Sequence, residues 1–279
     1  MRIVQLPPMC FAQFPPPYHL TSLVRCYWAV DRPGGDNGPS TFNTMADGLP
    51  GVMVVLPGGA MLQDAEKGEM PPAFLYGQAT RFRTFKAEGP LRAVGAYLQP
   101  HALRALFGMA AEERTDGCFD LEKTYTDPGA LRTLLEATNA DGAIAALSGH
   151  FPRLMAQHAR LLDEPVTRAM ELVMARKGDV DIADLRSVAG LSARTFERRF
   201  KQSIGLPPLL FARIRRFQHT LALLREGRYT KLSDIAYAAD YADQSHYIRS
   251  FKEFTGISPL EFIREGHEVV ENFVELPPG

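Results

Sequence analysis

The chain repeats a stretch of itself, because residues 191–205 reappear in altered form at 241–256. Self-similarity at a fixed spacing is the mark of a duplicated structural unit. The segments just before them correspond at a shift of 50 rather than 51, so one unit has an extra residue in its turn. At the shift of 51 the matched pairs are Phe196 with Tyr247, Arg198 with Arg249, Phe200 with Phe251, Lys201 with Lys252, Gly205 with Gly256, Leu206 with Ile257 and Pro208 with Pro259.

The first copy predicts a helix with one apolar and one charged face. Phe196, Phe200 and Ile204 fall four positions apart, which places them on one stripe of a helix with 3.6 residues per turn. The apolar stripe is expected to pack on a core, and the charged face is left for solvent or a ligand. That charged face carries Arg194, Glu197, Arg198 and Lys201.

The residues that flank each expected helix are those that begin and end helices. Ser192 and Asp243 stand at N-cap positions, where a side-chain oxygen accepts a main-chain amide of the first turn. Gly205 and Gly256 follow the last turns, where a left-handed residue closes a helix. Both helices are therefore expected to begin and end at corresponding positions.

A shorter apolar-periodic segment precedes each of these helices, at 181–189 and 231–239. Helix, tight turn and helix form a helix-turn-helix, so the sequence predicts one such unit at about 181–205 and a second at about 231–256. A connecting helix is expected at 208–226, with Gly227 after it. Its apolar stripe is Leu210, Ile214, Phe217, Leu221 and Leu224.

A protruding helix with a cationic face fits the major groove of B-DNA, whose base edges present distinct donors and acceptors. One such helix alone is more often only solvated surface, but two in register favour a DNA reader. A connecting helix of 19 residues would be about 28 Å long. That is close to the roughly 34 Å between successive major-groove faces, so one rigid connector could place both reading helices on one side of a duplex.

Residues 165–264 resemble the DNA-binding domain of the AraC/XylS family of bacterial transcription regulators. The resemblance is carried by GLSARTFERRFKQSIGLPP in the first unit and IAYAADYADQSHYIRSFKEFTGISP in the second. The family usually has Gly before the aromatic residue of the second turn, where this chain has Asp240 before Tyr241. Because Asp tolerates a left-handed conformation better than most residues, the turn is expected to survive.

Residue by residue, the resemblance implies contacts to base edges from Arg194, Glu197 and Arg198 in the first helix and from Gln244, Ser245 and Arg249 in the second. Arg can pair with guanine, Gln with adenine, and Glu can accept from cytosine N4. Arg199 points to the side and is expected to be only solvated. Contacts to the DNA backbone are expected from Ser192, Lys201, Asp243, His246 and Lys252.

Charge divides the chain in the same way. Residues 165–264 hold 17 Lys and Arg against 11 Asp and Glu, a net charge of +6, whereas the whole chain has a net charge of −1. The remainder therefore has a net charge of −7. A basic module attached to an acidic one is the asymmetry expected when only one part meets nucleic acid.

The fold class expected is α+β, with a β-rich amino-terminal domain at 1–160, an all-α DNA-binding domain at 161–266 and a tail at 267–279. The layout resembles the sensor halves of AraC-type proteins, and VGAYLQPHALRALFG is similar to a stretch in a subset whose amino-terminal domain has no assigned function. Strands are predicted at 23–31, 51–57, 73–78, 81–89 and 91–100, and helical segments at 101–108 and 128–162.

The sequence offers no support for catalysis, a metal site or a cofactor. The cysteines and histidines lack metal-site spacing, and the histidines are interpreted as surface or hydrogen-bonded residues. Tyr27, Trp28 and Phe82 could line a small-molecule pocket, but core packing is the favoured interpretation and no ligand-binding residue is assigned. The amino terminus is not typical of a signal peptide, and no apolar run predicts a membrane span, so a cytoplasmic location with reduced thiols is expected.

The function predicted is sequence-specific transcription regulation, in which the carboxy-terminal domain reads double-stranded promoter DNA. A small-molecule effector or formation of a homodimer would act through the amino-terminal domain. The resemblance favours an activator, which would also contact RNA polymerase. Two alternatives stay open: an enzyme or ligand-binding protein fused to a helical interaction module, and a nonspecific architectural DNA binder.

Overall fold

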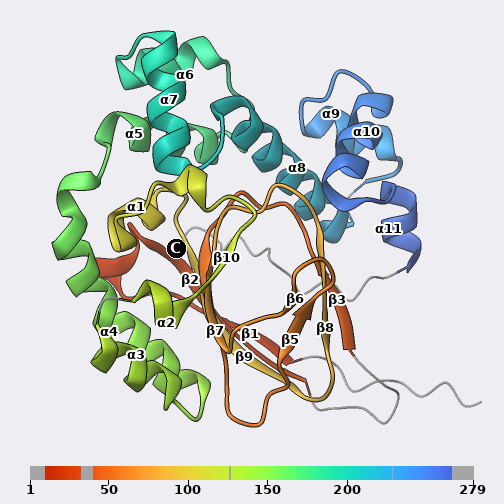
Figure 1. Ribbon diagram of the computed structural model, residues 1–279. Coiled ribbons are helices and arrows are strands. Elements are labelled where there is room, and N and C mark those ends of the chain that lie inside the picture. Colours follow the sequence, from red (N-terminus) through yellow and green to blue (C-terminus); the bar gives the residue numbers. More distant parts are fainter. Residues whose placement is uncertain (1–9, 33–39, 126, 228, 266–279) are drawn as a thin grey trace, which may run out of the picture.

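The computed structural model describes residues 10–32, 40–125, 127–227 and 229–265, so the predicted tail at 267–279 lies outside the described residues. Figure 1 shows a β-rich amino-terminal part with the carboxy-terminal helices across its top. The strands form two antiparallel sheets. The larger has the order β1 (Cys10–Phe14), β2 (Val24–Arg32), β9 (Leu91–Leu98), β4 (Gly51–Val55), β7 (Ala73–Tyr76) and β10 (Cys118–Asp120), and the smaller β3 (Ser40–Thr44), β8 (Arg83–Ala87), β5 (Leu62–Asp64) and β6 (Gly68–Glu69).

The larger sheet is buried on both faces. In β4 the side chains of Val52 and Val54 belong to the core beneath the helices, whereas Met53 belongs to the core between the two sheets. Successive side chains of a strand point to opposite faces, so a continuous apolar run such as GVMVV indicates a strand that is covered on both sides. The amino-terminal domain is therefore built in three layers: helices, larger sheet and smaller sheet.

A glycine makes room for the only tryptophan of the chain. Trp28 on β2 is opposite Gly95 on β9 and is 4% exposed. A Cβ atom at position 95 would lie 2.4 Å from the Trp28 ring and 2.3 Å from the main-chain oxygen of Val52. The indole consequently packs closely against the main chain at Gly95, within the core between the two sheets.

The helical flank covers the outer face of the larger sheet. Predicted as one run from 128, it contains two main helices, because Asn139 accepts the Gly142 amide through its side chain and begins a new helix. The expectation of one continuous segment was therefore wrong in detail. The flank comprises α1 (Ala102–Phe107), α2 (Leu121–Thr124), α3 (Pro128–Leu135), α4 (Ala140–His158) and the short 3-10 turns Tyr18–Leu20, Ala111–Glu113 and Ala159–Leu161.

The carboxy-terminal helices follow the predicted double pattern closely. The connecting helix α8 occupies Pro208–Glu226, as expected, and Gly227 closes it with a left-handed conformation. The first unit is formed by α6 (Ile182–Ala189) and α7 (Ala193–Ile204), and the second by α9 (Leu232–Ala238) and α10 (Gln244–Thr255). One helix precedes and one follows the pair, α5 (Glu164–Ala175) and α11 (Pro259–Glu265).

Aromatic rings join both units to α8. Near its start Phe211 packs on Phe200 of α7 with ring centroids 6.0 Å apart, and farther along Phe217 packs on Phe251 and Phe254 of α10 at 5.5 and 5.1 Å. All of these rings are buried, and burial of such a ring contributes roughly 1.5–3 kcal/mol. The apolar stripe of the connecting helix therefore serves as the shared core of two otherwise separate units.

The five predicted strands are all present, as β2, β4, β7, β8 and β9. The strands β1, β3, β5, β6 and β10 were not expected, because they are short and carry few β-branched residues in polar or Pro-rich surroundings. Among the described helices, none is long and apolar enough to cross a membrane.

Candidate nucleic-acid interface

The second helix of the first unit, α7, begins at the predicted place without the predicted cap. Ser192 has the extended conformation of an N-cap, but its hydroxyl donates to the Thr195 hydroxyl at 3.0 Å rather than accepting a main-chain amide. The capping role expected of this side chain was therefore wrong. The first-turn amides of α7 are left available for another acceptor.

In the second unit the cap and the turn are both as expected. Asp243 accepts the main-chain amide of His246 at 2.8 Å, and this bond is the main cause of the lowered pKa of its carboxyl. Asp240 adopts the expected left-handed conformation, with φ of +53°. Tyr241 then packs into the core and forms a hydrogen bond with Ser250 at 3.2 Å.

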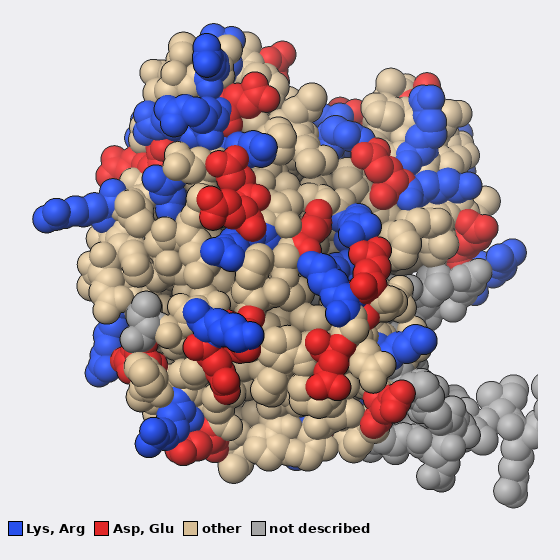
Figure 2. All heavy atoms as spheres, in the orientation of Figure 1, with Lys and Arg blue, Asp and Glu red and all other residues tan. Residues whose placement is uncertain are grey.

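Every residue predicted to contact a base edge is exposed in the structure. The two helix-turn-helix units lie at opposite ends of α8 (Figure 1). Figure 2 shows Lys and Arg side chains on the surface of both units. The roles of these residues stay predictions, but their placement leaves the side chains free of the core. They are Arg194, Glu197 and Arg198 on α7, and Gln244, Ser245 and Arg249 on α10.

Two predicted backbone contacts have neighbours within the protein. Lys201 lies 3.8 Å from Glu112 of the amino-terminal domain, with half of its side chain exposed. The Asp243 carboxylate already occupies the His246 amide, which a phosphate would otherwise use. The remaining candidates, Ser192, His246 and Lys252, are exposed.

Arg199 is not merely solvated, so that expectation was wrong. Its guanidinium donates to both carboxylate oxygens of Asp163, at 2.7 and 2.8 Å, and this contact raises the pKa of the arginine. Asp163 also caps α5 by accepting the Val166 amide. Arg199 therefore fixes α7 to the helix that precedes the first unit.

Residues 45–50 join the amino-terminal domain to the connecting helix. Met45 and Ala46 are buried in the core of the carboxy-terminal domain. The side-chain amide of Gln218 donates to the main-chain oxygen of Ala46, and Arg215 donates to that of Asp47 at 3.5 Å. The segment continues into β4 through Gly48, whose left-handed backbone, with φ of +66°, lies against Phe211.

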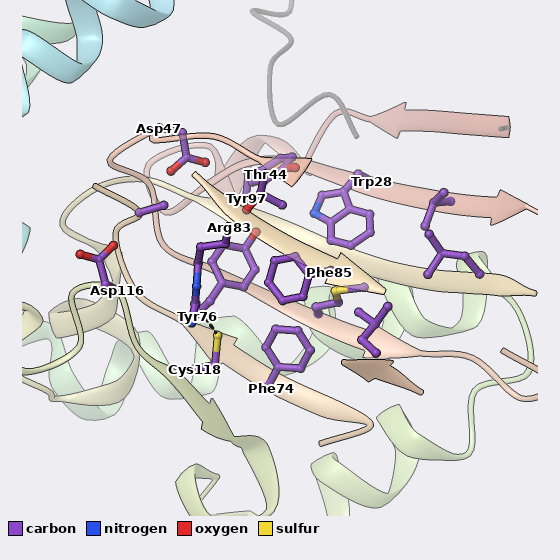
Figure 3. A pocket seen from close by; sticks show the side chains of 16 residues that line it. Trp28, Thr44, Asp47, Phe74, Tyr76, Arg83, Phe85, Tyr97, Asp116 and Cys118 are labelled. Carbon is purple, nitrogen blue, oxygen red and sulfur yellow. Dashed lines mark hydrogen bonds between the residues drawn. The ribbon is translucent and has the colours of Figure 1, made fainter. Parts of the chain in front are cut away.

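The same segment lines a cavity of about 80 Å³ between the two sheets. Figure 3 shows Asp47 and Asp116 at one end of it and the rings of Trp28, Phe85 and Phe74 toward the other. Burial raises the pKa of the Asp47 carboxyl to about 7, against the opposing effects of the Leu49 amide and the Arg215 guanidinium. The volume suffices for several water molecules, and a ligand with a benzene ring would require the cavity to widen.

The three aromatic residues considered for a pocket have three different environments. Trp28 lines the cavity, whereas Tyr27 lies in the other core and bonds to Ser148 at 2.9 Å. Phe82 is 39% exposed and lies beside Gly256, at the end of α10. Core packing therefore describes Tyr27 well, and Trp28 has a second role as cavity wall.

The interpretation of the histidines as surface or hydrogen-bonded residues holds for His101, which has a main-chain hydrogen bond at Ser22, but not for His150, whose ring nitrogens have no hydrogen-bond partner among the described residues. His101 and His150 are 8% and 5% exposed. Burial lowers the pKa of His101 to about 4, so this side chain is neutral. His150 stacks on Tyr125 with ring centroids 4.8 Å apart. Both are structural residues of the amino-terminal domain.

Sequence reasoning did not identify the residues that connect the cavity to the connecting helix, which are Asp47, Arg215 and Gln218. Asp47 stands in a Gly- and Pro-containing turn, where an acidic residue is usually solvated. Arg215 and Gln218 interrupt an apolar stripe at its edge. The one signal in the sequence that could have found them is the position of Arg215 and Gln218. Both flank the buried stripe of α8, a helix that already packs on both helix-turn-helix units.

Comparison with known proteins agrees with this division of the chain. Residues 185–265 match a family described as a helix-turn-helix domain, and residues 12–120 match one described as a domain of unknown function (DUF6597). Two AraC-like transcription regulators, from Streptomyces antibioticus and Streptomyces lividans, are each 33% identical over 81 residues, which is 29% of this chain and 26% of theirs. The chain thus matches about a quarter of the length of these relatives.

Among solved structures, ToxT from Vibrio cholerae has a TM-score of 0.45 at 14% identity, covering 81% of this chain and 97% of that one. A structure of ToxT with bound unsaturated fatty acid has a TM-score of 0.46 at 15% identity, covering 99% and 100%. The carboxy-terminal part of the present chain is a double helix-turn-helix domain. Its sequence is similar to part of the AraC-like transcription regulators.

Proposed function

We propose that the protein is a sequence-specific, DNA-binding transcription regulator that reads two successive major grooves and is controlled by a small molecule in its amino-terminal domain. The observation that carries the proposal is the placement of α7 and α10 at opposite ends of one helix, with all their candidate base-contacting side chains exposed. The relatives described as AraC-like regulators support the same function. Activation, with contact to RNA polymerase, rests on the family resemblance alone.

The connecting helix supports the reading of two grooves. Its length of 19 residues corresponds to about 28 Å, and its buried aromatic contacts at both units hold them in one arrangement. A salt bridge between Arg213 and Glu253 joins α8 to the second unit, and Arg216 lies 3.6 Å from Asp179 in the turn that precedes the first unit. A single chain would then place two recognition helices without a second copy.

Control by a small molecule is supported by the cavity and by its continuity with α8. Residues 45–50 line the cavity through Asp47 and reach the carboxy-terminal core through Met45 and Ala46. A ligand that favours one arrangement of this segment changes DNA affinity only by its differential binding to the two arrangements. The regulator would act in the cytoplasm, where bacterial DNA is found.

The test uses the full-length protein and DNA from upstream of its own and neighbouring genes, titrated with salt and with random-sequence competitor. A regulator should show a steep salt dependence and keep a preference of about 10³ or more for its site over random DNA. An architectural binder would have similar affinity for every sequence. Turnover or tight ligand binding without salt-dependent DNA binding would favour the fused enzyme or ligand-binding protein.

The double variant Arg198→Ala and Arg249→Ala tests the two arginines assigned to base edges. Each loss should reduce discrimination by about 1–3 kcal/mol, while the salt-dependent binding to random DNA is largely kept. Arg132→Ala, at an exposed position of α3, is the matched control and should keep both affinity and selectivity. Unchanged selectivity in the double variant would remove the assignment of Arg198 and Arg249.

A further inference from the structure

The wall of the cavity is mainly apolar and rich in aromatic rings. Val30, Met53, Leu62 and Leu91 line it together with several rings. Such a wall accepts a flat or compact apolar body, and the faces of aromatic rings also attract cations. The rings are those of Trp28, Phe74, Tyr76, Phe85 and Tyr97.

The ionisable groups of the wall are not balanced. Arg83 is paired with Asp64 at 2.9 Å, with both side chains less than a tenth exposed, and it also donates to the Cys118 sulfur at 3.2 Å. Its charge is therefore already neutralised within the protein. Asp47 and Asp116 lie together at one end of the cavity (Figure 3), and the nearby Arg215 guanidinium offsets only part of their charge. An anionic ligand would meet repulsion there and a cationic one attraction.

Asp47 and Asp116 differ in their existing partners. Both carboxylate oxygens of Asp116 accept from Thr80, at 2.8 and 2.5 Å. Asp47 accepts the Leu49 amide through one oxygen at 2.9 Å, and the nearby Arg215 donates to its main-chain oxygen. Because burial raises the pKa of Asp47 to about 7, an added cation is what would favour its charged form.

A buried polar pair lies in the same wall. The indole of Trp28, a residue only 4% exposed, lies beside the hydroxyl of Tyr76, and this contact lowers the pKa of that phenol against the larger, opposite effect of burial. A phenolic hydroxyl that accepts from an indole can still donate to a bound molecule.

We propose that the cavity binds a small, mainly apolar organic amine whose basic nitrogen pairs with Asp47, and that residues 45–50 carry its presence to α8. The proposal rests on the proposed function, since its consequence is a change in DNA binding. When the nitrogen engages the carboxylate, Asp47 is drawn toward the cavity. The main-chain oxygens of Ala46 and Asp47, which hold Gln218 and Arg215, move with it, and α8 shifts together with the two recognition helices that it supports.

The chain contains its own reporter, because its single tryptophan lines the cavity. Trp28 fluorescence of the full-length protein can be followed while 2-phenylethylamine, 2-phenylethanol or phenylacetate is added at neutral pH. These probes share a ring and differ in the charge of the terminal group. The amine should produce a saturable change and bind about tenfold more tightly than either analogue, as expected for a charge-assisted hydrogen bond.

Asp47→Asn tests the assigned carboxylate. The variant should lose the preference for the amine over the alcohol while still binding the alcohol, because the cavity keeps its shape. Asp141→Asn, an exposed change on α4, is the matched control and should retain the preference. If Asp47→Asn does not fold, the three-probe comparison on the wild-type protein still decides the ligand class.

Equal or tighter binding of 2-phenylethanol or phenylacetate, or no response to any of the probes, would overturn the proposed ligand class. Transmission is measured by the affinity for promoter DNA with and without saturating amine. It should change several-fold in the wild-type protein and remain constant in Asp47→Asn. An amine that binds without changing DNA affinity would overturn the role of residues 45–50. Failure of the proposed function itself would appear separately, as absence of site preference in DNA binding without any amine.

Discussion

The side-chain amide of Gln218, on the connecting helix, donates to the main-chain oxygen of Ala46, which lies 172 positions earlier in the chain. Both residues are buried. A buried carbonyl that loses its donor retains the full cost of desolvation. This contact therefore stabilises the association of the two domains as well as the local structure.

Replacing Gln218 with Met keeps the length of the side chain and removes the donor. We expect the free energy of unfolding to fall by about 1–2 kcal/mol, measured by urea denaturation of the full-length protein. Gln63→Met, at an exposed position of β5, should change it by less than about 0.5 kcal/mol. An unchanged unfolding free energy in Gln218→Met would show that this contact adds nothing to stability.

Two arginines on the same helix should respond in opposite ways. Arg199→Ala removes the guanidinium partner of the more buried Asp163 and should lower the unfolding free energy by about 1 kcal/mol without altering DNA selectivity. Arg194→Ala, at an exposed position, should lower DNA selectivity and leave stability nearly unchanged. Urea denaturation measures the unfolding free energy of each variant, and competition binding measures its DNA selectivity. Loss of selectivity in Arg199→Ala together with loss of stability in Arg194→Ala would contradict both assignments.

The stability of the protein should depend on pH through Asp47. Its pKa in the folded protein is about 7, above that of an unfolded Asp at about 3.9, so the folded state binds more protons between these values. The unfolding free energy should accordingly fall as pH rises from about 4 to 7 and then level off. The charged groups that oppose the shift are Arg215 and Arg25.

Asp47→Asn removes this titration while retaining an acceptor for the Leu49 amide. Relative to the wild-type protein, the variant should gain stability between pH 5 and pH 8, on the order of a few kcal/mol. Guanidinium denaturation at the two pH values measures the difference, with Asp141→Asn as the control for loss of one carboxylate. A wild-type-to-variant difference that is the same at both pH values would contradict the assigned titration.

Adding one methyl group at Gly95 should displace Trp28, which lines the cavity. The new Cβ atom would meet the main-chain oxygen of Val52 and the Trp28 ring at distances no real Cβ tolerates, so Gly95→Ala should cost about 1–3 kcal/mol and shift the fluorescence of Trp28. Gly149→Ala on α4, where a Cβ atom meets nothing within 4 Å, should instead stabilise by up to about 1 kcal/mol. Equal effects at the two glycines would refute the packing argument.

Local pattern predicted the carboxy-terminal domain well because its helices carry their own signals. The stripe of Phe196, Phe200 and Ile204, the stop at Gly227 and the left-handed Asp240 are all consequences of neighbouring residues, and the structure contains each of them. The short strands of the smaller sheet were not predictable in this way, because pairing between β3 and β8 brings together segments about forty residues apart.

The residues of the candidate site show the same difference between features set by neighbouring residues and features set by the tertiary fold. Exposed positions on α7 and α10 could be inferred from helix periodicity, so the predicted base contacts all lie on the surface. The cap at Ser192 failed because a hydroxyl can choose another partner, here Thr195. Asp47 could not be recognised, since only the three-dimensional fold brings a turn between β3 and β4 against a helix that begins at residue 208.

Met45 and Ala46 complete the hydrophobic core of the helical domain although they belong to the other half of the sequence. A chimera that joins this helical domain to a foreign sensor domain would therefore lack the side chains of Met45 and Ala46 and leave part of the core beside α8 unfilled. We expect such a graft to fold cooperatively only when residues 45–50, or an apolar substitute for them, are transplanted together with the helices. The structural boundary between the two domains thus differs from the boundary in the sequence, because Met45 and Ala46 of the amino-terminal half belong to the core of the helical domain.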